Sequence, residues 1–398
     1  MRYAPILDRL AALGSAKWEV HYAALRLAAA GRDVIDLTIG NPDVPAPEAL
    51  VEGAAAAMRA GRTQYSTGRG EPALRAALAA RYAARAGREV TPDQVLCFPG
   101  TQTALYAVLM GLAEPGAEVL VGDPMYATYE AVIRAGGATP VPVPLRAERG
   151  FRLAAEDLAA RVTPRSRAIL LNTPHNPTGA VLTPADLGAI GEVARAHDLW
   201  IVSDEVYEEL VFDGTPFASP FDRTELADRT VAVSSISKSH AAPGFRSGWA
   251  VSSADCADRL LPLSETMLFG NQPFIADMTA GAVAAPSAVA AGMRARFAAR
   301  ARYLADRLAQ ETALRVHRPD AGMFALVDVT ATGMDDTAYA MDLLEATGVA
   351  VMPGTSFGES LAGWVRVALT VDDTRFRAAA DRIVAHAAAP KARARARA

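Results

Sequence analysis

Lysine is rare in this chain, and one lysine stands where it could do chemistry. Lysine and arginine together number 40, yet lysine occurs only at positions 17, 238 and 391. Lys238 lies in the polar segment 234–240, directly after the apolar run 230–233, which has the composition of a buried strand. Arginine stays charged, whereas lysine can lose its proton and act as a nucleophilic amine. The position therefore indicates a reactive amine, with a surface lysine in a loop as the plainer alternative.

Other polar segments follow apolar runs in the same way. Segment 172–179 (Asn-Thr-Pro-His-Asn-Pro-Thr-Gly) follows the run 168–171, and segment 203–207 (Ser-Asp-Glu-Val-Tyr) follows the run 200–202. Segment 244–249, which contains Arg246, comes just after the lysine. In an open α/β sheet, ligands bind where the strands reach their carboxyl ends. We therefore expect these amide, carboxylate and phenol groups to meet Lys238 at one edge of one sheet.

Strands and helices alternate along most of the chain, which predicts how these groups are positioned. Strands are expected at 95–98, 118–121, 140–143, 168–171, 200–202, 230–233 and 249–251, and helices at 47–60, 72–85 and 185–197. This alternation predicts an α/β fold with a mostly parallel, seven-stranded sheet covered by helices. After about residue 286 the pattern changes to a long helix at 288–311, followed by strand-like segments at 322–328 and 349–351.

The change of pattern divides the chain into two expected domains. A large domain is expected at 41–287, and a smaller α+β domain at 1–40 and 288–388, where the N-terminal segment, with a strand expected at 34–39, joins the C-terminal part. Residues 389–398 carry alternating basic residues and are expected to form a disordered basic tail.

The composition of the chain argues against binding to nucleic acid, membranes or metal ions. The net charge of −4 gives no general attraction to nucleic acid or to acidic membranes, and no apolar run is long enough to span a bilayer. The two cysteines, Cys97 and Cys256, provide neither a disulfide framework nor the spacing of a metal site. We expect a cytoplasmic protein that binds no metal, no nucleic acid and no membrane.

The segments around Asn176, Asp204, Lys238 and Arg246 together resemble those of the class I and II aminotransferases, which are pyridoxal-phosphate enzymes of fold type I. Each segment alone is a weak signal, but four in this order and at family-like spacing are specific, and the resemblance runs from about residue 35 to residue 369. It implies pyridoxal 5′-phosphate as cofactor, an amino acid and a 2-oxo acid as substrates, and a homodimer with shared active sites.

The resemblance also assigns roles to the reactive groups. Lys238 would hold the cofactor as a Schiff base and, once released by substrate, would move the proton at the α-carbon. Asp204 would face the ring nitrogen; the adjacent Glu205 competes for this role, but neighbouring strand residues point to opposite faces. Tyr207 and Asn176 would donate hydrogen bonds to the phenolic oxygen, and the peptide bond between Asn176 and Pro177 would be cis.

The resemblance implies a phosphate site, an aromatic ring on the cofactor and a substrate site. The phosphate would lie at a helix N-terminus that begins with a glycine, where N–H groups are free. The residues implied for the phosphate are Gly100, Thr101, Gln102, Ser235 and Arg246, with Tyr65 reaching across a dimer to the partner's phosphate. Tyr126 would stack on the cofactor ring. Arg366 would bind the substrate α-carboxylate through a bidentate pair, completed by Asn176 and the Gly40 N–H.

Segments outside these motifs resemble the branch of the family that transfers the amino group of arginine to pyruvate. They are the opening Met-Arg-Tyr and the segments 16–25, 130–132, 196–200 and 237–241. The chain departs from that branch at Ala242 and Phe245, which leaves another guanidino or basic amino acid equally possible as donor. Glu19 is expected to pair with the cationic side chain while Trp18 or Tyr22 packs on its flat face; a solvated Glu19 with core aromatic residues is the alternative.

Three other functions stay open at this point. The same cofactor site could serve a carbon–sulfur lyase or a decarboxylase, or a transaminase for neutral or aromatic amino acids. A non-enzymatic regulator with an aminotransferase-like domain is disfavoured, because no helix-turn-helix pattern precedes residue 34.

Overall fold

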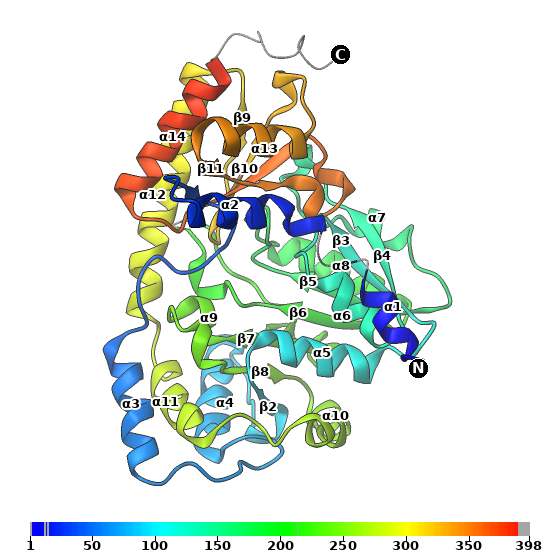
Figure 1. Cartoon of the computed structure of the whole chain (residues 1–398). Coiled ribbons are helices and arrows are strands. Elements are labelled where there is room, and N and C mark those ends of the chain that lie inside the picture. The colour runs from blue at the N-terminus through cyan, green and yellow to red at the C-terminus, as the bar shows by residue number, and fades with distance from the viewer. Residues whose placement is uncertain (1, 12, 14–15, 213, 389–398) are drawn as a thin grey trace.

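The computed structural model describes residues 2–11, 13, 16–212 and 214–388, and a seven-stranded sheet forms its centre (Figure 1). The strands are β2 (Val95–Phe98), β3 (Glu118–Asp123), β4 (Thr139–Pro144), β5 (Ser166–Asn172), β6 (Trp200–Asp204), β7 (Thr230–Ser235) and β8 (Gly248–Val251). Their order across the sheet is β2-β8-β7-β6-β5-β3-β4. Six of the strands run in the same direction, and β8 runs antiparallel to both of its neighbours, β2 and β7. The predicted α/β fold with a mostly parallel, seven-stranded sheet is confirmed.

Both faces of this sheet are buried under helices. The described helices are α1 (Pro5–Ala11), α2 (Glu19–Ala29), α3 (Glu48–Arg59), α4 (Pro72–Ala86), α5 (Thr101–Leu112), α6 (Tyr129–Ala135), α7 (Ala155–Ala159), α8 (Pro184–Ala196), α9 (Ile236–Ser239), α10 (Ala254–Met267), α11 (Pro273–Val283), α12 (Ala288–Glu311), α13 (Asp336–Thr347) and α14 (Asp373–Ala388). In β5, Leu170 packs with α5 and α10, whereas the next residue, Leu171, packs with α8 on the other face. A strand buried on both faces needs a continuous apolar run, and this is why the strands of the sheet were recognisable in the sequence.

The parallel register brings the ends of β5 and β6 together. Asn172 and Asp204 are paired at the last position of the two strands. The next strand, β7, leads through Ser235 directly into the four-residue helix α9, which carries Lys238. Three of the polar segments predicted to meet are therefore neighbours at one edge of the sheet, as their order along the chain implied.

A second group of elements packs around two smaller sheets. Strands β9 (Arg315–His317), β10 (Phe324–Asp328), β12 (Met352–Pro353) and β13 (Trp364–Ala368) form a four-stranded antiparallel sheet, and β1 (Ile35–Asp36) pairs with β11 (Val349–Ala350). Helices α2, α13, α14 and the C-terminal part of the long helix α12 lie together with these sheets (Figure 1). The division into domains at 41–287, 1–40 and 288–388 stays a prediction, and the expected basic tail at 389–398 lies outside the described residues.

The expected strand at 34–39 is shorter in the structure than the sequence indicated. It ends at Asp36, whose side-chain oxygen accepts hydrogen bonds from the N–H and the hydroxyl of Thr38. An aspartate that bonds the backbone two residues on turns the chain away from a regular strand. The backbone at Thr38 thereby becomes free to bond other parts of the structure.

No single helix of the described segments is both long and apolar enough to cross a membrane. Helices α11 and α12 pass that test only when they are joined, and they are bent by 69° relative to each other.

Candidate active site

A cavity of about 260 Å³ lies at the carboxyl ends of β5 and β6 and the start of α9. Its lining comes from both groups of elements, since Gly40, Phe324 and Arg366 belong to the smaller sheets and the segments around them. Most of the residues predicted for the site line it: Gly40, Thr101, Gln102, Tyr126, Asn176, Asp204, Tyr207, Ser235, Lys238, Arg246 and Arg366. The structure therefore brings together side chains that are spread over more than 300 positions of sequence.

Lys238 extends from α9 into this cavity. Its Nζ donates a 2.7 Å hydrogen bond to the backbone oxygen of Gly40. Burial, together with the nearby cations Arg366 and Arg246, lowers the pKa of Lys238 from 10.5 to about 8. Both effects disfavour the ammonium form, so a useful fraction of this lysine is a neutral amine near physiological pH.

Asp204 lies at the end of β6 and faces the cavity. Its Oδ2 accepts a 2.7 Å hydrogen bond from the hydroxyl of Tyr129, and its Oδ1 accepts one of 3.1 Å from the backbone N–H of Val206. Burial raises the pKa of Asp204 to about 6, although these two donors favour the charged form. The carboxylate is thus held in a fixed orientation and is ionised at neutral pH.

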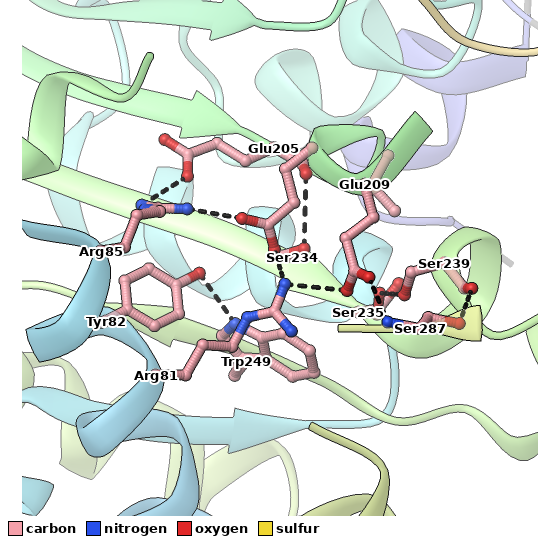
Figure 2. A network of polar contacts seen from close by, with 12 residues as sticks. Arg81, Tyr82, Arg85, Glu205, Glu209, Ser234, Ser235, Ser239, Trp249 and Ser287 are labelled. Carbon is pink, nitrogen blue, oxygen red and sulfur yellow. Dashed lines mark hydrogen bonds and ion pairs between the residues drawn. The ribbon is translucent and has the colours of Figure 1, made fainter. Parts of the chain in front are cut away.

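Glu205 points to the opposite face of the sheet, as the alternation of strand residues requires. It is fully buried, accepts a 2.5 Å hydrogen bond from the hydroxyl of Ser219, and pairs with Arg85 of α4 at 3.0 Å (Figure 2). Burial raises the pKa of Glu205 to about 7, against the lowering effect of Arg85. The side of β6 away from the cavity therefore ends in a separate network of ion pairs, and Glu205 does not line the cavity.

The turn after β5 positions Asn176. The side chain of Asn172 accepts a 2.8 Å hydrogen bond from the Asn176 N–H and donates one of 3.1 Å to the Asp204 backbone oxygen. The peptide bond between Asn176 and Pro177 is cis, as the resemblance implied. Tyr207 lies beside Asn176 at the cavity wall, and burial raises its pKa well above the usual value, so its hydroxyl stays protonated and can donate.

One end of the cavity is built from backbone and hydroxyl donors. Gly100 precedes α5 with a φ of 88°, and a Cβ added there would meet the guanidinium of Arg246. The hydroxyl of Thr101, the first residue of α5, is buried and has no hydrogen-bond partner among the described residues. Ser235 caps α9 by accepting a hydrogen bond from the N–H of Ser237. The free N–H groups of the α5 N-terminus, two hydroxyls and Arg246 converge here, and such a group of donors suits a phosphate.

The opposite end of the cavity holds a buried cation. Arg366 is 3% exposed, and its guanidinium lies between the rings of Phe324 at 3.9 Å and Phe357 at 4.3 Å. Among the described residues it donates to two uncharged groups, the Asn176 side chain at 3.0 Å and the Thr38 backbone oxygen at 2.5 Å. Burial lowers the pKa of Arg366 to about 10. The Nε atom of Arg366 has no hydrogen-bond partner among the described residues.

A buried cation whose described partners are all neutral is costly for the folded protein. A small carboxylate in the cavity would offset this cost.

Three predicted residues lie outside the cavity lining. Gly100 is one residue behind it and packs against Arg246. Tyr65 is 91% exposed and lies 5.8 Å from the ring of Phe269 in a separate surface hollow. Glu19 is exposed at the start of α2, which contradicts the expectation that it faces the substrate. Trp18, the residue that precedes α2, lines the cavity instead.

Sequence reasoning missed several residues of the site. Tyr129, which bonds Asp204, was given no role; it lies three residues after Tyr126, at the first turn of α6. Asn41 and Phe324 also line the cavity, and Phe357 covers Arg366; Asn172, which belongs to a predicted polar segment but was given no role of its own, lines it as well. The apolar residues carried no sequence signal, because their role depends on which strand they pack against.

The residues present fit pyridoxal phosphate. The Thr101 hydroxyl, which has no hydrogen-bond partner in the described part of the chain, and the α5 N-terminus offer donors for a phosphate, Asp204 offers an anion for the ring nitrogen, and Lys238 offers an amine of lowered pKa. Arg366 at the other end offers a cation for a substrate carboxylate. These are the groups that the cofactor and an amino acid require.

Comparisons with known proteins agree with this chemistry. The family model described as aminotransferase class I and II matches residues 32–383. Arginine–pyruvate transaminase AruH of Pseudomonas aeruginosa is 44% identical over 388 residues, which is 98% of either chain. An aspartate/prephenate aminotransferase of Cereibacter sphaeroides is 35% identical over 92% of this chain and 94% of its own.

Solved structures give the same result. The aspartate aminotransferase of Thermus thermophilus with maleate superimposes with a TM-score of 0.90 at 32% identity, covering 97% of this chain and 100% of that one. The chain therefore belongs to the class I and II aminotransferases, and it is a pyridoxal-phosphate-dependent transaminase of fold type I.

Proposed function

We propose that this transaminase takes the amino group from arginine or another guanidino or basic amino acid and passes it to a 2-oxo acid such as pyruvate. The main support for an amino acid as substrate is Arg366, a buried cation in the same cavity as Lys238 and Asp204. Its hydrogen-bond partners among the described residues are all neutral, so it is available to bind an α-carboxylate. The similarity to an arginine–pyruvate transaminase over nearly the whole chain supports the choice of donor. The reaction proceeds in two halves, in which the first 2-oxo acid leaves before the second one binds.

Lys238 is assigned two tasks in this proposal. It holds the cofactor covalently, and after substrate has displaced it, its free amine takes the proton from the substrate α-carbon and later returns it. When bound, pyridoxal phosphate supplies an electron sink for the electron pair left at that carbon. With a pKa of about 8, the amine of Lys238 can accept and release a proton near neutral pH. The Gly40 backbone oxygen, 2.7 Å from Nζ, is the acceptor for the protonated form.

Asp204 keeps the cofactor ring nitrogen protonated in this proposal. It is negatively charged at neutral pH, buried, and held by Tyr129, so its charge acts at a fixed place in a site of low polarity. Tyr207 and Asn176 donate to the phenolic oxygen on the other side of the ring, and Tyr126 stacks on the ring face. Gly100, Thr101, Gln102, Ser235 and Arg246 bind the phosphate.

Arg366 binds the substrate α-carboxylate, together with the Asn176 side chain and the Gly40 N–H. Two aromatic rings fix the plane of its guanidinium, and Asn176 holds one of its nitrogens. This pre-organisation orients the α-carbon towards Lys238 before reaction and reduces the entropy lost on binding.

The active unit is proposed to be a homodimer with shared sites. Tyr65 is almost completely exposed in the single chain and does not reach its own cavity, although its segment matches the family's phosphate-binding tyrosine. A tyrosine in such a position is explained if its hydroxyl reaches the phosphate of the partner subunit. The neighbouring Phe269, 56% exposed, would be covered by the same contact.

Trp18 is the residue that we assign to the substrate side chain. It lines the cavity from the N-terminal segment, and the flat face of an indole is a good partner for a guanidinium. Asp204 is the one carboxylate of the described chain that lines the cavity, and it is occupied with the cofactor. Discrimination for a cationic donor therefore rests on the aromatic face and on backbone oxygens.

The experiment that tests the proposal measures amino donors against pyruvate and 2-oxoglutarate. Arginine should give the highest kcat/KM with pyruvate, and alanine rather than ammonia should accumulate. Release of ammonia or carbon dioxide would point to lyase or decarboxylase chemistry, and equal rates for arginine and methionine would reject a site selective for guanidino groups.

A second measurement identifies the lysine independently. Reducing the cofactor-loaded enzyme with borohydride fixes the cofactor on its lysine, and peptide mass mapping should find it on Lys238. The Lys238→Ala variant should take up no covalent cofactor and should be inactive, and label on another lysine would reject the assignment.

A further inference from the structure

The hydrogen bond between Lys238 and Gly40 joins two segments whose secondary-structure elements are too short to be stable by themselves. The two residues are 198 positions apart, and their hydrogen bond is 2.7 Å long. Lys238 lies in α9, a helix of four residues, and Gly40 follows β1, a strand of two residues. Isolated elements of this length are unstable, because a single helical turn forms few hydrogen bonds for the residues it orders. Both segments are bonded instead to the same long helix, α12.

The first anchor is Ser287, the N-cap of α12. Its hydroxyl oxygen accepts from the Ala290 N–H, and its O–H donates a 2.7 Å hydrogen bond to the backbone oxygen of Ser239, next to Lys238. The Ser287 N–H donates to Glu209 at 2.8 Å, and Glu209 is held in turn by Arg81 of α4 at 2.9 Å (Figure 2). Ser287 and Ser239 are both buried. The start of α12 is thus fixed to the lysine-bearing turn on one side and to the ion-pair network behind the sheet on the other.

The second anchor is Asp43, three residues after Gly40. Both oxygens of its carboxylate accept 2.8 Å hydrogen bonds from Arg296, and Oδ2 accepts a third of 2.8 Å from Arg300. The Asp43 side chain is 3% exposed. Burial disfavours its charge, but the two guanidinium groups outweigh that effect and hold the pKa of Asp43 below its usual value. Pro42 limits the backbone between Gly40 and this anchor, so fixing Asp43 also fixes the Gly40 loop.

Both anchors are held by one continuous helix, which begins after Ser287 and carries Arg296 and Arg300. α12 runs without a break from Ala288 to Glu311, and at 1.5 Å per residue Ser287 and Arg296 are about 13 Å apart along it. The pair between Asp43 and Arg296 is bidentate, and such a pair fixes the relative geometry of its two partners as well as stabilising them. We propose that α12 sets the separation between Lys238 and the Gly40 backbone, with Ser287, Asp43 and Arg296 as positioning residues that touch neither cofactor nor substrate.

This arrangement has a measurable consequence for the lysine. A carbonyl oxygen that accepts from the ammonium stabilises the protonated form, so moving Gly40 away lowers the pKa of Lys238 further. The ionisable groups that share the cavity with Lys238 are Tyr126, Tyr129, Asp204, Tyr207, Arg246 and Arg366. None of them bonds Ser287, Asp43 or Arg296, so weakening either anchor leaves these charges in place. A change in Lys238 titration then reports the distance to Gly40.

The test compares Ser287→Ala and Arg296→Gln with the unaltered protein. The full chain is loaded with pyridoxamine phosphate, the amine form of the cofactor, which leaves Lys238 free. Acylation of Lys238 by an amine-selective reagent is followed by mass spectrometry across a pH series, with Lys17 as an internal reference. We expect the midpoint of the Lys238 profile to fall by about one pH unit in each variant, a tenfold change in the ratio of ammonium to amine. kcat should fall several-fold while KM for the donor changes less.

Matched controls separate positioning from general loosening. Ser287→Thr keeps the hydroxyl and should give the normal midpoint. Arg307 lies further along α12, and Arg307→Gln removes its ion pair with Asp381 of α14, which should leave the Lys238 midpoint unchanged. Loosening alone would admit water and raise the midpoint, because burial is the main cause of the lowered pKa of Lys238, whereas loss of the Gly40 contact lowers the midpoint. In the Ser287→Ala/Arg296→Gln double variant the two shifts should be non-additive, because both act through one hydrogen bond.

Normal midpoints in both single variants, or the same shift in Arg307→Gln, would overturn the inference. The inference rests on Lys238 as the cofactor-binding lysine, and the borohydride experiment tests that assignment separately. Label on another lysine would reject the assignment, whereas label on Lys238 with unshifted midpoints would reject only the role of α12.

Discussion

The hydroxyl of Tyr129 donates a 2.7 Å hydrogen bond to Oδ2 of Asp204, 75 residues further along the chain. Tyr129 begins α6, and its burial raises its pKa well above the usual value, so it acts only as a donor. This bond opposes the effect of burial on Asp204 and favours the charged form. The charge that we propose for the cofactor ring nitrogen therefore depends on a residue to which the sequence analysis gave no role.

Replacing Tyr129 by phenylalanine removes this donor, so the pKa of Asp204 should rise above its present value of about 6. A carboxyl group with a higher pKa is ionised only at higher pH. Activity should therefore fall most below neutral pH and recover towards pH 8.5, with the acid limb of the kcat/KM profile moved up by about one unit. Tyr303→Phe, on the outer part of α12, serves as control. An unchanged acid limb in Tyr129→Phe would show that this bond does not tune Asp204.

Arg366→Ala and Arg246→Ala should separate substrate binding from cofactor binding. Removing Arg366 should raise KM for every amino donor, alanine included, by roughly a hundredfold, because all donors share the α-carboxylate. Removing Arg246 should weaken the cofactor instead, measured as loss of bound pyridoxal phosphate on dialysis. If Arg366→Ala raises KM for arginine and leaves KM for alanine unchanged, Arg366 binds the donor side chain rather than the α-carboxylate, and its assigned role is wrong.

Mixing two inactive variants tests the shared site. In a dimer formed from one Tyr65→Ala chain and one Lys238→Ala chain, one of the two sites regains both a native lysine and a native tyrosine. Random reassociation of equal amounts should restore about a quarter of wild-type activity. No restoration is expected if Tyr65 serves its own subunit, and an active monomer in gel filtration would contradict the dimer altogether.

The side-chain site can be tested at two adjacent residues. Trp18→Ala should lower kcat/KM for arginine about tenfold more than for methionine, because a desolvated cation–π contact is lost. Glu19→Gln should change either donor by less than about twofold, since the structure places this carboxylate in solvent. A large loss for arginine in Glu19→Gln, with methionine unaffected, would restore the role that the sequence alone suggested for Glu19.

Local sequence determined the framework of this protein. The strands of the large sheet were recognisable as short apolar runs, because strands buried on both faces need an unbroken apolar sequence; the edge strand β4, which is largely half-buried or exposed, is the exception to this reason. The same logic located the polar residues that follow β5, β6 and β7, since groups at the carboxyl ends of neighbouring parallel strands must meet. Asn176, Asp204 and Lys238 were predictable for this reason.

Tertiary structure decided the parts that depend on distant partners. Whether Trp18 or Glu19 faces the cavity follows from how the segment that leads into α2 packs against the rest of the protein, with Trp18 at the N-cap and Glu19 as the first residue of the helix. The partners of Arg366 come from Thr38, Asn176, Phe324 and Phe357, and only the assembled sheets bring them together. The joint support of Lys238 and Gly40 by α12 is of the same kind, since a helix can couple two loops only after the chain has folded back on itself.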